Sequence, residues 1–470
     1  MTFGALFVHG YHPWAEDAEL YLPSVEKLLD PRLFPFNAQF FESHAHLTFF
    51  PYLIATSVRV SHLSLPFALF FWHLISIFLL LLACQELAGK CFTSSRVSSY
   101  GAVALLAALL TLPVAGTALY IMDQYLNPRN LAASLAVLSI LKLLDRKYVP
   151  AALLLFVGAA IHPLMSAFAV AFCLLLFCLQ NYGSQWGLAA YLLPLGILDP
   201  PTAAYHQAVM SHSYFYLLRW HWYEWLGAIG PMMIFAWVAR IARVRKLGNL
   251  ELLSRTLVVY QTVFVIIAVI LTVPARFESL ARLQPMRSLY LSYLLLVLFS
   301  GGLLAEYALK NRWWRWMVLF LPLCAGMFYA QRGLFPASVH IEWPGLKPRN
   351  PWIQAFEWVR GNTPRDAIFA LDPYYMHIAG EDENGFRAVA ERSRLADALT
   401  DSGAVSMFPP LAGEWLAQVQ TQAGWREFGA TDFHRLQLKY GLNWVVLQQS
   451  QAVDLQCPYQ NPEVKVCRLD

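Results

Sequence analysis

Two adjacent carboxylates near the start of the chain have the side chains best suited to chemistry. Glu16 and Asp17 are followed two residues later by Glu19. Neighbouring acids can supply a general base, and they can hold a divalent cation such as Mg or Mn. The same acids would also stabilise the first turn of a helix that continues through Leu20–Leu29, because they oppose its dipole. The spacing alone fits both interpretations.

Three arginines stand at turns where they could bind a phosphate group. Arg129 directly follows Asn127-Pro128. Arg282 and Arg287 lie together in a later turn. A guanidinium group is planar and can donate to two phosphate oxygens at once. The alternative is structural: Asn127 caps a helix that Pro128 begins, and the arginines extend toward membrane head groups.

Two further candidates come from a helix break and from the tail. His162-Pro163 interrupts an apolar run, and its imidazole could contact a ligand or carry a proton, although a histidine in an ordinary helix turn is the simpler interpretation. Arg387 lies in the charge-dense residues 381–394. That stretch either forms a solvated helix with an Arg387–Glu391 pair, which we favour, or faces a cavity where Arg387 binds substrate.

The composition indicates that most of the chain lies in a membrane. Of 470 residues, 58% are hydrophobic and 14% are charged, and the mean hydropathy is +0.45. A soluble core of this length could not hide so much apolar surface. We therefore predict a mainly α-helical polytopic bundle of about eleven spans, the first of which, Met1–Val8, is incomplete. The other ten cover about residues 66–88, 98–121, 130–145, 149–161, 164–180, 186–198, 223–241, 252–273, 285–305 and 313–331.

The basic residues give these spans a direction. One set of connecting loops holds thirteen lysines and arginines and the alternate set holds four, which places the first set in the cytoplasm. The first long loop, residues 10–65, and the tail, residues 340–470, then lie outside the cytoplasm. Residues 1–339 form the predicted membrane domain. Within the loop, Thr48–His62 predicts a helix along the membrane interface.

The tail predicts a soluble α/β domain. Asn350-Pro351 should begin a helix that stops at Gly361. Apolar runs and helical periodicity predict two strands and two further helices. These elements cover Ala367–Leu371, Asn443–Leu447, Pro409–Gln422 and Thr431–Tyr440.

The cysteines and the absence of several well-known motifs exclude some classes of protein. Cys457 and Cys467 flank a predicted hairpin and could form a disulfide outside the cytoplasm, whereas the other five cysteines lie in or beside apolar spans. The sequence has no zinc-type Cys/His spacing and no Walker loop, Rossmann fingerprint, GxSxG or HExxH motif. No basic stripe predicts a nucleic-acid partner.

Together these features resemble the GT-C superfamily of membrane glycosyltransferases, which combine many spans, an acidic pair in a long first extracytoplasmic loop and often a soluble C-terminal domain. More narrowly, the chain is similar to an uncharacterised bacterial multi-pass family with GT-C-like architecture. The resemblance rests on residues 10–17 (GYHPWAED), 21–23 (YLP), 33–35 (LFP), 127–129 (NPR), 162–163 (HP), 283–287 (LQPMR), 385–387 (GFR) and 391–393 (ERS).

The resemblance implies a transferase in the bacterial inner membrane. It would take a sugar from a polyprenyl-phosphate donor in the lipid bilayer and pass it to a glycan, lipid or protein outside the cytoplasm. Asp17, and after it Glu16, would be the catalytic carboxylate, with a divalent cation in some members. Arg129 and Arg287 would bind the phosphate.

Three other residues belong to the predicted substrate-binding set: His162, Arg282 and Arg387. The alternative function is a multi-pass transporter or flippase of a lipid-linked or anionic substrate. A transporter predicts inverted repeats and polar residues near mid-span. The charged residues of this sequence gather instead at one predicted membrane face, which favours the transferase.

Overall fold

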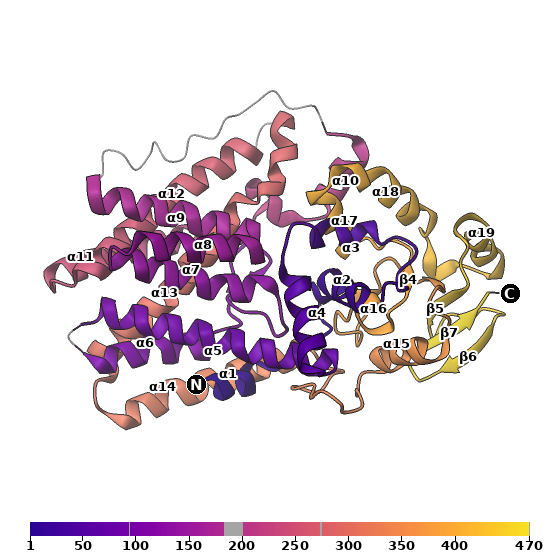
Figure 1. Ribbon diagram of the computed structural model, residues 1–470, viewed down its shortest axis with the longest axis horizontal. Coiled ribbons are helices and arrows are strands. Elements are labelled where there is room, and N and C mark those ends of the chain that lie inside the picture. Colours follow the sequence, from indigo (N-terminus) through magenta and orange to yellow (C-terminus); the bar gives the residue numbers. More distant parts are fainter. Residues whose placement is uncertain (94, 183–200, 273–274, 470) are drawn as a thin grey trace. The chain divides into compact units, whose positions relative to one another are not determined.

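The computed structural model describes residues 1–93, 95–182, 201–272 and 275–469 (Figure 1). Its contacts divide the chain into two compact units. The helical unit comprises Met1–Gly10, Trp72–Pro201 and Ser213–Ala330. The mixed unit comprises Tyr11–Phe71, Thr202–His212 and Gln331–Asp470.

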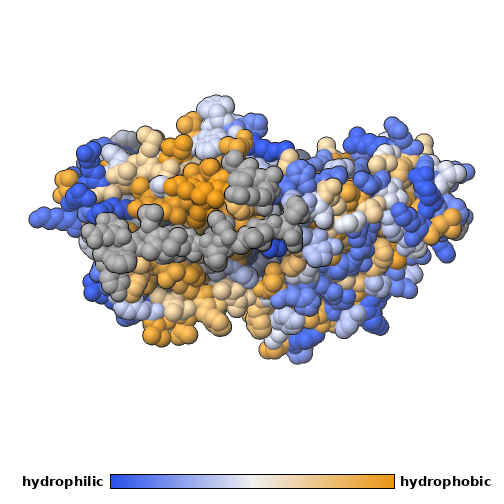
Figure 2. Space-filling model, turned by 90° about the horizontal axis from the view of Figure 1, so that it is seen from above, coloured by the Kyte–Doolittle hydropathy of each residue, from blue (hydrophilic) through white to orange (hydrophobic). Residues whose placement is uncertain are grey.

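Six helices in the described residues are long and apolar enough to cross a membrane. They are α5 (Leu65–Cys91), α9 (Pro163–Tyr182), α11 (Trp222–Val244), α12 (Gly248–Thr272), α13 (Leu289–Leu304) with its flanking turns, and α14 (Trp313–Leu334). Apolar side chains gather on the outer surface of the helical unit, whereas the visible face of the mixed unit is largely hydrophilic (Figure 2). The prediction of a helical membrane protein is therefore supported by several helices that are long and apolar enough to cross a bilayer.

The prediction of eleven spans is not confirmed. Among the described residues of the helical unit, four other helices are shorter: α1 (Thr2–His9), α6 (Arg96–Ala108), α7 (Pro128–Leu144) and α8 (Tyr148–Ile161). The predicted span 186–198 lies outside the described residues.

The predicted span 98–121 is wrong in its second half. Helix α6 ends at Ala108, and β1 (Pro113–Val114) pairs antiparallel with β2 (Leu119–Tyr120). Pro113 disfavours a helix at the residue before it. The turn also needs Gly116, whose φ is +65° and where an added Cβ would lie 2.5 Å from the Trp220 side chain.

Small residues bring the helices of this unit into close contact. A Cβ added to Gly101 of α6 would lie 2.2 Å from the Cβ of Ala305, and one added to Gly301 of α13 would lie 2.6 Å from the Gly101 carbonyl oxygen. Membrane helices pack at such short separations where glycine removes the side chain. Helices α7, α8 and α9 also pack against one another, as do α11 and α12.

The mixed unit is built around a five-stranded sheet in the order β4-β3-β5-β7-β6. Strand β3 (Ile368–Ala370) is parallel to both β4 (Ser393–Arg394) and β5 (Trp444–Gln448). Strand β7 (Val464–Arg468) runs antiparallel to β5 and to β6 (Gln456–Gln460). The α/β fold predicted for the tail is present.

The tail also contributes five helices to the described part of the mixed unit. They are α15 (Pro351–Asn362), α16 (Phe386–Ala390), α17 (Thr400–Met407), α18 (Ala412–Thr421) and α19 (Ala430–Tyr440). Of these, α15 packs against strands β6 and β7. Asn350 caps α15 by accepting a hydrogen bond from the Trp352 backbone N–H at 2.8 Å. Gly441 ends α19 in a left-handed conformation, with φ 70°.

The first long loop contributes three helices to the same unit. They are α2 (Ala18–Leu29), α3 (Gln39–Ala45) and α4 (Phe50–Ser61), and α10 (Ala203–Met210) joins them from mid-chain. Sequence patterning groups the loop with the membrane domain 1–339, whereas the contacts group residues 11–71 with the tail. The reason is a set of buried polar contacts between loop and tail.

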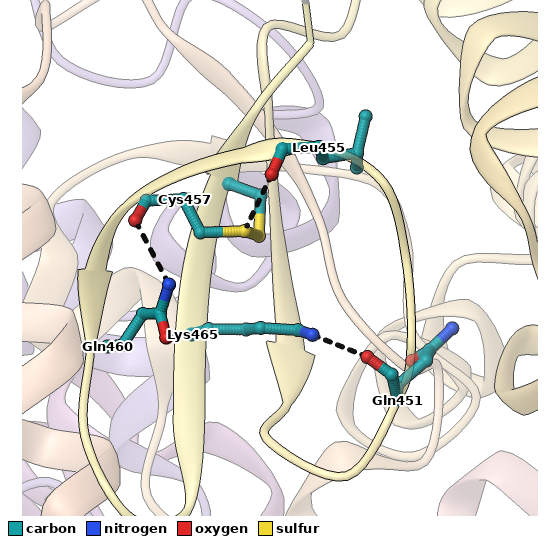
Figure 3. Close-up of a disulfide and its surroundings, with 6 residues drawn as sticks. Gln451, Leu455, Cys457, Gln460 and Lys465 are labelled. Carbon is teal, nitrogen blue, oxygen red and sulfur yellow. Dashed lines mark hydrogen bonds between the residues drawn. A yellow bond between two sulfur atoms is a disulfide. The ribbon is translucent and has the colours of Figure 1, made fainter.

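A disulfide bond crosses the hairpin of β6 and β7 (Figure 3). The two sulfur atoms of Cys457 and Cys467 lie 1.98 Å apart. At the turn, the Asn461 backbone N–H donates to the Val464 carbonyl oxygen at 2.9 Å. Beside the bond, the Lys465 ammonium donates to the Gln451 carbonyl oxygen. The disulfide that the sequence analysis considered possible is therefore present. The other five cysteines are free thiols.

Candidate functional site

The helical unit has a small, shallow apolar hollow that is open to its surroundings. Helices α7, α9 and α13 and the 3-10 turn η5 (Pro285–Ser288) form its wall. Among the described residues of that wall, Arg287 is the charged one. The lining residues are Ala132, Ala133, Ala136, Met165, Phe168, Ala169, Arg287, Tyr290, Leu291 and Leu294.

Local structure fixes Arg287 at this wall. Gln284 adopts a left-handed conformation, with φ 47°, and Pro285 then begins η5. The Arg287 guanidinium lies 5.3 Å from the centre of the Tyr214 ring, within range of a cation–π interaction. Such a contact orients the guanidinium, whose planar shape suits it to bind an anion. An apolar hollow bordered by an arginine has the two kinds of surface that an amphipathic anion would contact.

Arg129 lies at the first turn of α7, the helix that also supplies three alanines of the wall. The Asn127 side chain accepts from the Arg129 backbone N–H at 3.0 Å, and Pro128 is the first helical residue, as predicted. The guanidinium donates to both carboxylate oxygens of Asp123, at 2.7 and 2.6 Å. Arg129 is 4% exposed, so it is paired inside the unit and does not extend toward a membrane surface.

His162 and Arg282 differ in their relation to the hollow. His162 follows the last residue of α8, and its Nδ1 accepts from the Met165 backbone N–H at 3.3 Å. Met165 lines the hollow, so the break between α8 and α9 borders it. Arg282 is half-buried in the turn η4 (Ala275–Leu283) and does not line the hollow.

Glu16 and Asp17 belong to the mixed unit and are held at its first turn. Glu16 has φ 50°, a left-handed conformation, and its backbone N–H donates to the Glu383 carbonyl oxygen at 2.8 Å. Asp17 precedes α2, and neither acid is fully buried. The predicted helix after the acids is therefore present, and the acidic pair lies at its start.

His44 of α3 is a neighbour of Asp17 that the sequence patterns miss. Burial lowers the pKa of His44 to about 4 although part of the residue reaches the surface, and the charge of Asp17 opposes that shift. The imidazole is therefore neutral at physiological pH. A neutral ring beside the carboxylate leaves Asp17 without a compensating positive charge from His44.

Glu19 anchors the acidic segment in the tail. Its carboxylate is fully buried and accepts from the Arg387 backbone N–H at 2.7 Å and from Arg394 Nε at 2.8 Å. Nearby, the Gly385 backbone N–H donates to the Trp14 carbonyl oxygen at 2.8 Å. Side-chain charge and backbone pairing together fix the segment that carries Glu16 and Asp17.

The preference for a solvated helix around Arg387 is wrong. Arg387 is 1% exposed, and its two terminal nitrogens each donate to Asp401 at 2.9 Å. Arg394 donates to Asp397 and Asp401 at 2.6 and 3.3 Å. Burial raises the pKa of the Glu19 carboxyl although both arginines oppose that shift. The guanidinium of Arg387 is already occupied by this network of charged partners.

The donor set for a metal is incomplete within the described residues. Among them, no three or more His, Cys, Asp or Glu side chains are grouped so that they could hold an ion. Glu16 and Asp17 alone would need ligands from a substrate or from water. The described residues therefore do not supply a closed Mg or Mn site by themselves.

The predicted site residues fall into two groups. Arg129, His162 and Arg287 come from elements at or beside the hollow in the helical unit, whereas Glu16 and Asp17 lie in the mixed unit. Sequence patterns miss the buried partners. Those partners are Glu19, Asp123, Arg394 and Asp401. The patterns also miss His44, the half-buried neighbour of Asp17. Comparison with known proteins found no matching family model and no matching curated protein.

Proposed function

We propose that the protein is a membrane glycosyltransferase that moves a sugar from a polyprenyl-phosphate donor to a glycan, lipid or protein outside the cytoplasm. The observation that supports this proposal is the apolar hollow with Arg287 in its wall. A polyprenyl phosphate has the same two parts, a long apolar chain and an anionic head. The proposed location is a bacterial inner membrane, with the tail on the periplasmic or extracellular side.

In the proposed reaction, Arg287 pairs with the donor phosphate, and the first isoprenoid carbons next to that phosphate contact the apolar wall of the hollow. Asp17 takes the proton from the acceptor hydroxyl, with Glu16 as the second choice for this base. The acceptor oxygen then bonds to the anomeric carbon while the bond from that carbon to the phosphate oxygen breaks. Arg287 offsets the charge that develops on the departing polyprenyl phosphate. The buried pair of Asp123 and Arg129 holds the first turn of α7 in place.

The acidic pair provides the first test of the catalytic proposal. In membranes that contain the variant protein, we expect Asp17→Asn to reduce sugar transfer from lipid-linked donor by about 100-fold or more, because the base is lost. We expect Glu16→Gln to reduce transfer less. Transfer is measured by incorporation of radiolabelled sugar, with protein level followed by immunoblot. Full transfer by both variants at normal protein levels would reject the carboxylate role.

The hollow provides a second test, which measures binding and not turnover. The purified protein in nanodiscs should bind a polyprenyl phosphate more tightly than the corresponding uncharged polyprenol. We expect Arg287→Gln to reduce this preference about 10-fold, because one charge-assisted hydrogen-bond partner is lost. The matched control is Arg282→Gln, which removes an arginine that does not line the hollow. Equal losses in both variants would exclude a specific role for Arg287.

A transporter or flippase of a lipid-linked anion is the second candidate. The break at His162-Pro163 between α8 and α9 borders the hollow, and interrupted helices form binding sites in many transporters. Proteoliposomes separate the two functions. Movement of a fluorescent polyprenyl phosphate between leaflets without acceptor would support transport, and sugar transfer that depends on Asp17 would support the enzyme.

A further inference from the structure

Helix α4 carries apolar side chains on two faces, although only one face packs inside the protein. Phe50 and Ile54 are fully buried on the face that contacts α2. On the other side Phe49, Tyr52 and Val60 are 59%, 45% and 76% exposed. A surface helix normally places polar groups on its outer face. The second apolar face of α4 therefore needs a partner.

The first turns of α5 continue this exposed apolar surface. Phe67 and Phe71 are 47% and 54% exposed, and residues four apart lie on the same side of a helix. Helix α5 is 27 residues long and is one of the helices suited to cross a membrane. Its exposed aromatic side chains therefore begin within the mixed unit, before the helix continues into the helical unit.

A loop of the tail lies against the start of α5. The Trp343 ring is 5.1 Å from the ring of Phe70, and a Cβ on Gly345 would lie 3.8 Å from the Phe67 ring. Gly345 has φ +84°, and the Leu346 backbone N–H donates to the Trp343 carbonyl oxygen at 3.2 Å. This tight turn leaves Trp343 48% exposed and Leu346 70% exposed.

The charges beside these apolar groups have one sign. Arg59, Lys347 and Arg349 are exposed, and neither residues 47–63 nor residues 343–349 contain an acid. Exposed tryptophan and arginine or lysine next to apolar side chains are typical of protein surfaces at the head-group level of a membrane. Lysine and arginine near such a surface are attracted by anionic lipids.

We propose that the exposed face of α4, the first turns of α5 and the loop 343–349 form a lipid-contact surface that binds anionic head groups. The mixed unit is then held to the membrane by a surface of its own, and the tail loop belongs to that surface. Continuity with α5 and the unopposed basic residues select a lipid surface over a second copy of the chain or another protein. This inference does not depend on the proposed sugar transfer.

Depth-dependent fluorescence quenching tests the surface in the full chain. Val60→Cys and Leu346→Cys are each labelled with an environment-sensitive dye, after Cys178→Ser and Cys324→Ser remove the partly exposed native thiols. Nanodiscs with one protein each carry phosphatidylglycerol and lipids with a quencher near the head group. We expect several-fold stronger quenching at both positions than at the control Leu438→Cys, whose side chain is 75% exposed on α19. Quenching no stronger than at the control would reject the lipid surface.

The basic residues provide the second arm of the experiment. Lys347→Gln with Arg349→Gln should weaken quenching at position 346 in discs with phosphatidylglycerol and should have no effect in discs of phosphatidylcholine alone. Arg426→Gln removes another exposed arginine of the mixed unit and should change neither value. An equal response in both lipid compositions would reject the role of anionic head groups. Dye signals that change only when two proteins share a disc would identify a second copy as the occupant.

Discussion

Glu26 of α2 is a carboxylate inside the mixed unit. It is 4% exposed, and its Oε2 has no hydrogen-bond partner among the described residues. Burial raises the pKa of Glu26 well above its usual range, Glu391 raises it further, and Arg360 opposes both. The folded protein therefore holds a proton on Glu26 at pH values where an unfolded chain would release it.

This proton makes stability depend on pH at a single residue. Because the folded state binds more protons than the unfolded state above about pH 4.5, the free energy of unfolding should fall as the pH rises. We expect Glu26→Gln to abolish this decrease in the free energy of unfolding, because glutamine carries no titrating proton. The variant should exceed the wild type by about 1–3 kcal/mol near pH 8, with a smaller difference near pH 5. Thermal unfolding of the purified full chain across this range measures the effect.

The control for Glu26→Gln is an exposed acid in the same unit. Asp454 lies on the connection between β5 and β6, and Asp454→Asn should leave the pH dependence of the wild type unchanged. If Glu26→Gln shows the same pH dependence as the wild type, the buried carboxyl is not the source.

The sequence identifies single residues better than it identifies their partners. Residue type and spacing select Arg129 and Arg287, because arginine beside a helix start is suited to bind an anion. The pairing of Arg129 with Asp123, and of Arg387 with Asp401, depends on rotamers and on folding of the intervening turns. Neither pairing can be derived from spacing alone. For this reason Arg387 is predicted to lie on a solvated helix, whereas it is buried in the structure.

At the scale of elements, the hairpin of β6 and β7 offers a defined stability test. A disulfide that closes a short loop restricts the unfolded chain, and removal of this bond by Cys457→Ala with Cys467→Ala should cost about 2–3 kcal/mol. Urea or thermal unfolding, followed by limited proteolysis of the tail, measures the loss. Cys324→Ala, which removes a free thiol on α14, is the control. Equal stability of the double variant and the control would contradict the prediction.

Element boundaries follow from the sequence where capping residues mark them. Asn350-Pro351 predicts the start of α15, and the predicted helix Thr431–Tyr440 ends at the last residue of α19, because capping signals act within one turn of the chain. The end of α6 at Ala108 is missed because hydropathy does not distinguish a short helix followed by a hairpin from a full span. The helix predicted for residues 48–62 is found as α4, but its second apolar face is recognised only after one face has packed.

At the scale of the whole molecule, the distribution of basic residues predicts topology. The alternation of loop charge predicts that the acidic segment and the tail lie on the same, extracytoplasmic side. We expect a reporter fused after Asp470 to be active only outside the cytoplasm. A cysteine introduced by Glu16→Cys should react with a membrane-impermeant reagent added from that side. Opposite results at the two positions would contradict the proposed topology and, with it, the proposed transferase.

The pairing of first loop and tail could not be derived from the sequence. Glu19 and Arg387 are separated by 368 positions, and no local pattern reports a contact over that distance. Hydropathy assigns the loop to the membrane domain because the loop precedes the spans along the chain. The three-dimensional contacts follow the burial of charge instead, and they unite residues 11–71 with the tail.

That same separation has a consequence for biosynthesis. At about 5–20 residues per second, the ribosome adds Arg387 to the chain roughly 20–70 s after it adds Glu19. During this interval the Glu19 carboxylate lacks the arginine that donates to it in the folded protein. A premature stop codon before the Arg387 codon would therefore remove both arginines that donate to the buried Glu19 carboxylate.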